Sequence, residues 1–126
     1  MTGYSVNILE TSKELKAREK IAIKDTSNAK PLDEIVAVGF PVRIKPDWYA
    51  VLEIHNEKSE DKDYKKYVIV DKDGEKYVTG SESFFTSFRD IFTDMIGEEE
   101  DYEIECYKME SKNYKGKHFL TCSIVF

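Results

Sequence analysis

The feature that most constrains this fold is one helical stripe of apolar residues between Ser81 and Ile96. Thr79 or Ser81 is a suitable N-cap residue, and Gly97 is a suitable residue to follow the last turn. The apolar positions recur every three or four residues, as on one face of an α-helix: Phe84, Phe85, Phe88, Ile91, Phe92, Met95 and Ile96. The pattern predicts an amphipathic helix whose phenylalanines belong to the core.

The segments on both sides of this helix alternate between apolar and polar residues, which is typical of strands. We expect three strands before it and two after it: 48–55, 67–71, 76–80, 102–110 and 117–126. An Asp-Gly turn joins the second strand to the third. Three strands, a helix and two strands is the element order of an OB-fold, a small Greek-key barrel. An α+β sheet with one packed helix is the competing architecture.

The first 45 residues carry weaker patterns. We expect a strand at 4–9, a helix after the capping-box pair Thr11 and Glu14, a strand at 20–24, a loop at 25–31, a helix at 32–38 ended by Gly39, and a strand at 42–45 before a Pro46-Asp47 turn. The length suits one domain. We therefore predict a single OB-like domain over 1–126, with 1–45 as an N-terminal extension and 46–126 as the barrel core.

The charge is unevenly distributed along the chain, whose net charge is -6. Residues 81–110 contain two basic and ten acidic side chains, a balance of -8, whereas residues 111–126 contain three lysines and no acid. No apolar run approaches the ~20 residues of a membrane helix, and the N-terminus lacks the order of a secretory signal. We expect a cytoplasmic protein that does not insert into membranes.

Few residues suggest catalysis or metal binding. The two histidines, His55 and His118, stand on separate predicted strands without a nucleophile at a recognised spacing. No Gly-rich phosphate loop is present. Cys106 and Cys122 fall on the two arms of the last hairpin, with Cys106 expected nearly opposite Thr121, and small buried hydrophobes are the better interpretation. We expect no enzyme activity, no metal and no cofactor.

Aromatic and basic residues alternate on the predicted strands and loops, among them Tyr107, Lys108 and Phe119. Single-stranded nucleic acid needs flat rings for base stacking and nearby cations for the backbone. Tyrosine also suits any half-buried pleated surface, so composition alone leaves both interpretations open. The predicted nucleic-acid-binding residues are Arg43, Lys45, Trp48, Tyr49, Lys65, Lys66, Tyr67, Tyr77, Lys112, Tyr114, Lys115 and Lys117.

Three stretches carry a resemblance to a known group of proteins: DWYAVLEIHNEKS, YVTGSESFFTSFRDIF and SKNYKGKHFLTCSIV. They resemble small proteins from phages and mobile elements of Gram-positive bacteria, some of which are described as single-stranded-DNA-binding proteins. General bacterial single-stranded-DNA-binding proteins end in an acidic tail tipped with Pro-Phe, whereas this chain ends Cys-Ser-Ile-Val-Phe. The resemblance therefore implies DNA binding without that mode of partner recruitment.

The sequence thus leads to one functional hypothesis and one alternative. The first is a non-catalytic, OB-like protein that binds single-stranded DNA in phage or mobile-element replication or recombination, with RNA binding and homo-oligomerisation left open. The alternative is a small phage protein that binds a host protein as an inhibitor or adaptor through the acidic block Glu98 to Glu110. Binding that weakens with salt, as counterions are released, distinguishes the first from the second.

Overall fold

The computed structural model describes residues 4–58, 60, 62–98, 101–110 and 116–125. The chain divides into two compact units, each built from two stretches of sequence. The first unit comprises Met1–Lys30 and Asp47–Gly80, and the second comprises Pro31–Pro46 and Ser81–Phe126. The mainly β class predicted from the sequence is confirmed. The chain passes from one unit to the other after Lys30, Pro46 and Gly80, whereas the boundary predicted from the sequence follows residue 45.

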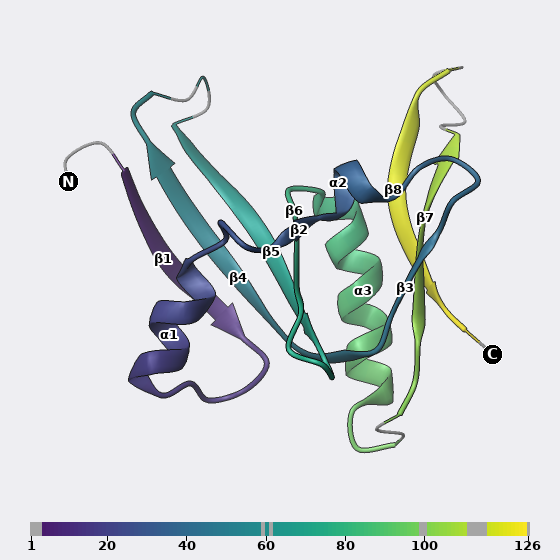
Figure 1. Ribbon diagram of the computed structural model, residues 1–126, viewed down its shortest axis with the longest axis horizontal. Helices are drawn as coiled ribbons and strands as arrows, with labels where there is room; N and C mark the ends of the chain where they lie inside the picture. Colours follow the sequence, from purple (N-terminus) through teal and green to yellow (C-terminus); the bar gives the residue numbers. More distant parts are fainter. Residues whose placement is uncertain (1–3, 59, 61, 99–100, 111–115, 126) are drawn as a thin grey trace. The chain divides into compact units, whose positions relative to one another are not determined.

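The first sheet has the strand order β1-β4-β5-β6-β2 (Figure 1). Its members are β1 (Tyr4–Thr11), β4 (Pro46–Asn56), β5 (Asp63–Asp71), β6 (Lys76–Thr79) and the two-residue β2 (Lys30–Pro31). β1 pairs antiparallel with β4, with Ile8 opposite Leu52 and an irregularity between Ile8 and Glu10. The predicted strand at 4–9 is therefore confirmed, and it belongs to the same sheet as β4. The predicted Pro46-Asp47 turn is wrong, because β4 begins at Pro46.

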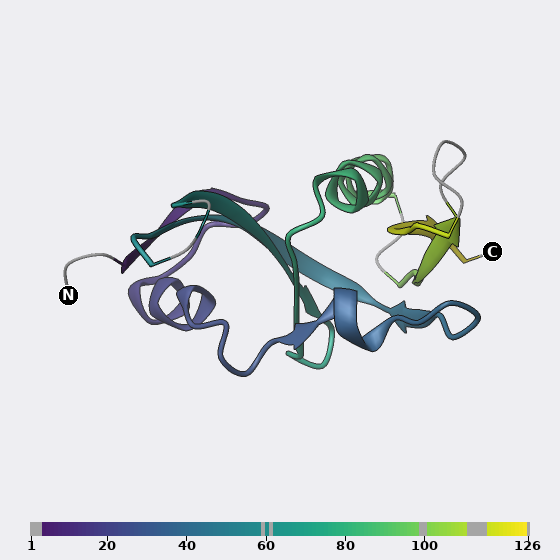
Figure 2. The same cartoon turned by 90° about the horizontal axis from the view of Figure 1, so that it is seen from above.

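The helix α1 (Ala17–Lys24) lies on one face of the first sheet (Figure 2). Ile23 of α1 joins the core formed by the even-numbered residues of β4, β5 and β6: Ala50, Leu52, Val68, Val70 and Val78. The predicted strand at 20–24 is wrong. A strand would place Ile21 and Ile23 on one face, whereas the helix buries Ile23 and leaves Ile21 exposed.

Side chains form hydrogen bonds at both ends of α1, and they are not those of the predicted capping box. The Glu19 carboxylate accepts the backbone N–H of Lys16 at 3.1 Å, five residues later than the expected pair Thr11 and Glu14. At the other end, Lys76 Nζ donates to the carbonyls of Ala22 and Asp25, at 2.9 and 2.7 Å. A residue distant in sequence thus satisfies the last carbonyls of the helix and favours its negative end.

The hairpin between β5 and β6 has the predicted Asp-Gly turn. Val68 lies opposite Val78, and Gly74 has a φ of +86°, a conformation that glycine adopts readily. The Asp71 carboxylate accepts the backbone N–H groups of Asp73 and Glu75, both at 2.9 Å. The side chain of Asp71 therefore fixes the turn that the sequence indicated.

The second sheet has the order β3-β7-β8, formed by Val42–Ile44, Ile104–Glu110 and His118–Ile124. The short helix α2 (Leu32–Ile35) precedes β3, and α3 (Glu82–Met95) precedes β7. In this unit α3 packs against β8. The predicted amphipathic helix is confirmed: the Ser81 hydroxyl accepts the Phe84 N–H at 3.2 Å, and Gly97 has a φ of +78°.

The core of the second unit is built from α3 and the inner face of the sheet. The buried side chains of α3 are Phe84, Phe85 and Phe88, as the spacing predicted. On β7 and β8 the buried positions alternate: Ile104, Cys106, Leu120 and Cys122. No helix in the described part of the chain is long and apolar enough to span a membrane.

Candidate nucleic-acid interface

The three tyrosines predicted to stack on bases in the first sheet are buried. Tyr49, Tyr67 and Tyr77 have exposed fractions of 6 to 8%. The Tyr49 hydroxyl donates to the Glu10 carboxylate at 2.6 Å. β5 buries consecutive residues from Tyr67 to Asp71, so both faces of this strand are covered. A ring without an exposed face cannot stack on a base, and we remove these three residues from the predicted site.

Trp48 remains half-buried. Its ring packs against the core of the first unit, and Lys13 Nζ lies 4.6 Å from the ring centroid. Lys13 also forms an ion pair of 2.9 Å with Glu19. A small pocket of about 300 Å³ is lined by the indole together with Ile23, Val70 and other residues of the first unit. The indole is therefore accessible in part but already has a cation as a neighbour.

The predicted phosphate-binding cations are found in different settings. Arg43 Nε lies 3.3 Å from the Glu105 carboxylate, and Lys45 Nζ lies 3.7 Å from the Asp101 carboxylate. Lys65 is exposed and Lys66 is half-buried at the start of β5. Lys117 is exposed just before β8. The remaining predicted residues, Lys112, Tyr114 and Lys115, lie outside the described residues.

The second sheet has one face with exposed aromatic and apolar side chains, which we call the open face. It lies opposite the buried positions of β7 and β8 and consists of Arg43, Glu105, Tyr107, Met109, Phe119, Thr121 and Ser123. Met109 lies directly opposite Phe119, and their exposed fractions are 43 and 40%. Tyr107 is half-buried opposite Thr121.

The open face contains residues that the predicted site lacked. Tyr107 and Phe119 were noted from the sequence as neighbours of lysines but were not chosen, and Met109 was missed. The alternation along the strand could have identified these residues. Tyr107 and Met109 are two residues apart, so their side chains lie on the face of the strand opposite to that of Cys106. An apolar row left exposed on a sheet face is a feature that often marks a binding surface.

The two cysteines lie directly opposite each other, one residue from the expected register. Both are buried and free. Burial raises the pKa of the Cys122 thiol to about 12 and that of the Cys106 thiol further, with smaller contributions from Cys122 and Glu105. Both thiols are therefore protonated at neutral pH and are poor nucleophiles.

His55 lies between two carboxylates on the surface of the first unit. Its Nδ1 is 2.7 Å from Asp63 and its Nε2 is 2.7 Å from Glu57. The hydrogen bond to Asp63, and to a lesser extent the one to Glu57, raises the pKa of His55 above its usual value of 6.5. This arrangement joins β4 to β5 across their loop when the ring is protonated. Within the described residues, no group of three or more His, Cys, Asp or Glu side chains is suited to hold a metal ion.

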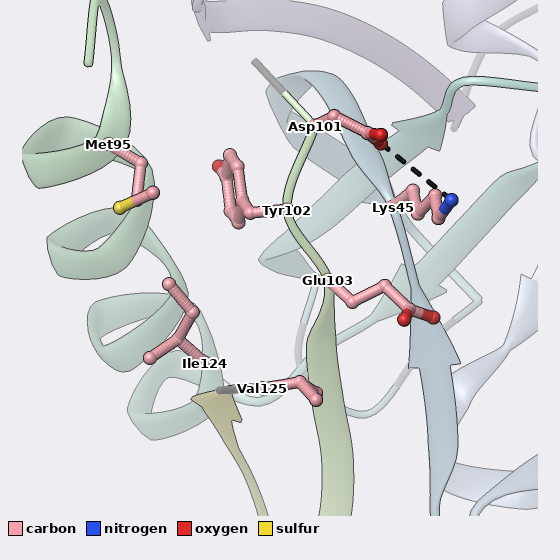
Figure 3. A pocket seen from close by; sticks show the side chains of 7 residues that line it. All are labelled: Lys45, Met95, Asp101, Tyr102, Glu103, Ile124 and Val125. Carbon is pink, nitrogen blue, oxygen red and sulfur yellow. Dashed lines mark ion pairs between the residues drawn. The ribbon is translucent and has the colours of Figure 1, made fainter. Parts of the chain in front are cut away.

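A pocket of about 510 Å³ in the second unit combines carboxylates with an apolar wall (Figure 3). It is lined by Lys45, Met95, Asp101, Tyr102, Glu103, Ile124 and Val125. Figure 3 shows the Tyr102 ring directed toward Met95, with Asp101 directed toward Lys45 on the other side. Burial raises the pKa of the Tyr102 hydroxyl to about 12, so this group stays neutral. We call this cavity the acidic pocket.

No protein-family model matches the chain, and no curated protein or solved structure shows significant similarity to it.

Proposed function

We propose that this chain is a non-catalytic single-stranded DNA-binding protein that uses the open face of the second sheet. The observation that supports the proposal is a row of accessible apolar side chains on this face: the half-buried ring of Tyr107 and the exposed side chains of Met109 and Phe119. The phage or mobile-element setting, the cytoplasmic location and a role in replication or recombination belong to the same proposal.

The chemistry of the open face suits a flexible, single-stranded ligand. Each base stacked on an aromatic ring contributes about 1–3 kcal/mol to the binding free energy, whichever base it is. Arg43 lies on this face, and the exposed Lys117 precedes β8. In the sequence, Lys112 and Lys115 stand between β7 and β8, close to Lys117. Cations beside stacking rings provide backbone contacts that add affinity without sequence preference.

An OB-like barrel is the finer part of this proposal. The element order from residue 46 supports it, since β4, β5 and β6 are followed by α3 and then by β7 and β8. The described strands form two separate sheets, with the orders given above. In an OB-fold the connection between the last two strands borders the ligand groove, and Met109 and Phe119 lie on the open face in the parts of β7 and β8 nearest to that connection.

Titration with a fluorescently labelled oligonucleotide at two salt concentrations tests the function. We expect binding that weakens with salt by a slope of about -0.7 per phosphate neutralised. Phe119→Ala should weaken binding by about 1–3 kcal/mol because it removes one stacking ring. Phe40→Ala is the matched control, because Phe40 is an exposed phenylalanine of the same unit that lies outside the open face.

The outcomes separate a failed function from a misplaced site. Absence of binding at low salt overturns the proposal as a whole. Binding that Phe119→Ala and Phe40→Ala weaken equally would show that the open face is not the site. Circular dichroism of each variant confirms that the fold is retained before affinities are compared.

The alternative function, capture of a host protein, also has an observation in its favour. The acidic run starts at Glu98, two residues after Ile96, whose side chain is strongly exposed. An acidic surface with exposed apolar side chains suits a basic protein partner. Binding to oligonucleotides that does not depend on salt, or no binding at all, would favour this alternative.

A further inference from the structure

The first unit carries an exposed apolar side chain within a basic helical surface. Ile21 of α1 has an exposed fraction of 72%. Arg18 and Lys24 lie one helical turn before and after it, and Lys20 precedes it. All three cations are exposed, and in the part of the chain that the structure describes no ion pair is found for them. We call this surface the basic knob.

The acidic pocket of the second unit has an apolar wall that suits Ile21 and carboxylates that suit the cations of the basic knob. Met95, Ile124 and Val125 form its apolar wall, and its volume of about 510 Å³ exceeds what one isoleucine side chain needs. Asp101 is paired with Lys45, whereas for Glu103 no ion pair is found among the described residues. Five of the six residues from 98 to 103 are acidic.

We propose that copies of this chain associate head to tail, with the basic knob of one copy docked in the acidic pocket of the next. Ile21 would contact the apolar wall, and Lys20 or Lys24 would lie beside Glu103. The desolvated isoleucine supplies the affinity, and the opposite charges select the orientation. The occupant is a second copy, because the same chain presents both surfaces with opposite charge.

Head-to-tail contacts have a consequence for assembly. Each copy keeps one free knob and one free pocket, so the contact is heterologous and extends into open chains unless it closes into a ring. We expect weak association, because one isoleucine and a few charged side chains bury less than the roughly 1,200 Å² of a stable interface. The association does not depend on nucleic acid, so the proposal stands apart from the proposed DNA binding.

Sedimentation velocity of the full chain without nucleic acid tests this association over a wide range of protein concentration. We expect the mean mass to rise with concentration beyond a dimer, and the association to weaken with salt. Ile21→Ser should weaken the association about tenfold or more, because burial of an isoleucine is lost. Since Ile21 is exposed, this variant should keep the melting temperature of the unchanged chain.

Charge exchange between the two surfaces gives the sharper test. Lys24→Glu and Glu103→Lys should each weaken the association when studied alone. Lys58→Glu is the matched control for Lys24→Glu, because Lys58 is an exposed lysine in the loop after β4. A mixture of Glu103→Lys with either Lys24→Glu or Lys20→Glu should restore association between the two variants.

Four results would overturn the inference: a monomer at every concentration, a mass that stops at a dimer, an Ile21→Ser variant that associates like the unchanged chain, or no restored association in either mixture. A mass that stops at a dimer counts against the inference because a closed dimer is neither an open head-to-tail chain nor a larger ring. DNA affinity measured with dilute protein reports separately on the open face, so failure of one proposal leaves the other intact.

Discussion

In the first sheet Tyr49, Tyr67 and Tyr77 are buried, whereas in the second sheet Tyr107 is half-buried and Phe119 is exposed. Both regions show aromatic residues alternating with lysines in the sequence. In β5 the consecutive residues from Tyr67 to Asp71 are buried, so both faces of the strand are covered there and the Tyr67 ring stabilises the fold. On β7 and β8 only alternate residues are buried, and the other face is left for a ligand.

The largest effect we expect contrasts two phenylalanines of the second unit. Phe88→Ala removes a ring that is fully buried and stacked near Phe84, so it should lower the free energy of unfolding by about 3–5 kcal/mol. Phe119→Ala removes a partly exposed ring and should cost less than about 1 kcal/mol. Urea unfolding followed by circular dichroism measures both. Equal losses would show that Phe119 is core.

A second pair of variants compares the tyrosines of the two sheets. Tyr67→Ala should lower the free energy of unfolding by about 3 kcal/mol and leave the DNA affinity of the folded protein unchanged, because its ring is buried. Tyr107→Ala should leave the free energy of unfolding nearly unchanged and weaken the DNA affinity by about 1–3 kcal/mol. Thermal melting and oligonucleotide titration are the measurements. Weaker DNA binding by folded Tyr67→Ala would show that the first sheet is part of the binding site.

A smaller effect is expected at Trp48. Lys13→Gln removes the cation near the indole and should lower stability by about 0.5–1 kcal/mol, with a change in indole emission. Lys58→Gln, a change of the same kind at a lysine in the loop after β4, is the control. We also expect saturating oligonucleotide to leave the emission of Trp48 nearly unchanged. Strong quenching would place Trp48 in the binding site.

The smallest effect concerns pH and His55. Its pKa is raised in the folded chain by Asp63 and Glu57, so the folded state binds the proton more tightly than the unfolded state. The resulting stabilisation is fully present below the unfolded pKa of 6.5 and is lost as the pH rises through the folded pKa. Melting temperatures at pH 6 and pH 8 should differ more for the unchanged chain than for His55→Gln. An equal difference would contradict this role for His55.

Several elements could be predicted from the sequence because their signals are local. The helix α3 has a repeated apolar spacing, a serine cap and a closing glycine, and all three act within one or two turns. The β5–β6 turn depends on Asp71 and Gly74, which lie within a few residues of each other. Such elements need no knowledge of distant segments.

The helix α1 was mispredicted because its stabilising contacts are not local. The run from Lys20 to Lys24 alternates like a strand, but Lys76 caps the helix from 52 residues beyond Lys24 along the chain, and Ile23 packs on strands β4 to β6. The strand pairing of β1 with β4 also joins distant residues, from Thr11 and Ala50, 39 positions apart, to Tyr4 and Asn56, 52 positions apart. Tertiary contacts therefore override the weak local pattern at the N-terminus.

The sequence by itself determined which segments are helix and strand from β4 onward, because their periodicity repeats over enough residues to decide the buried face. Only the tertiary structure decided which aromatic rings are available to a ligand. A strand pattern marks two faces but does not reveal whether a second layer covers the other face. That difference buries Tyr67 and exposes Phe119, and it moves the proposed interface from the first sheet to the second.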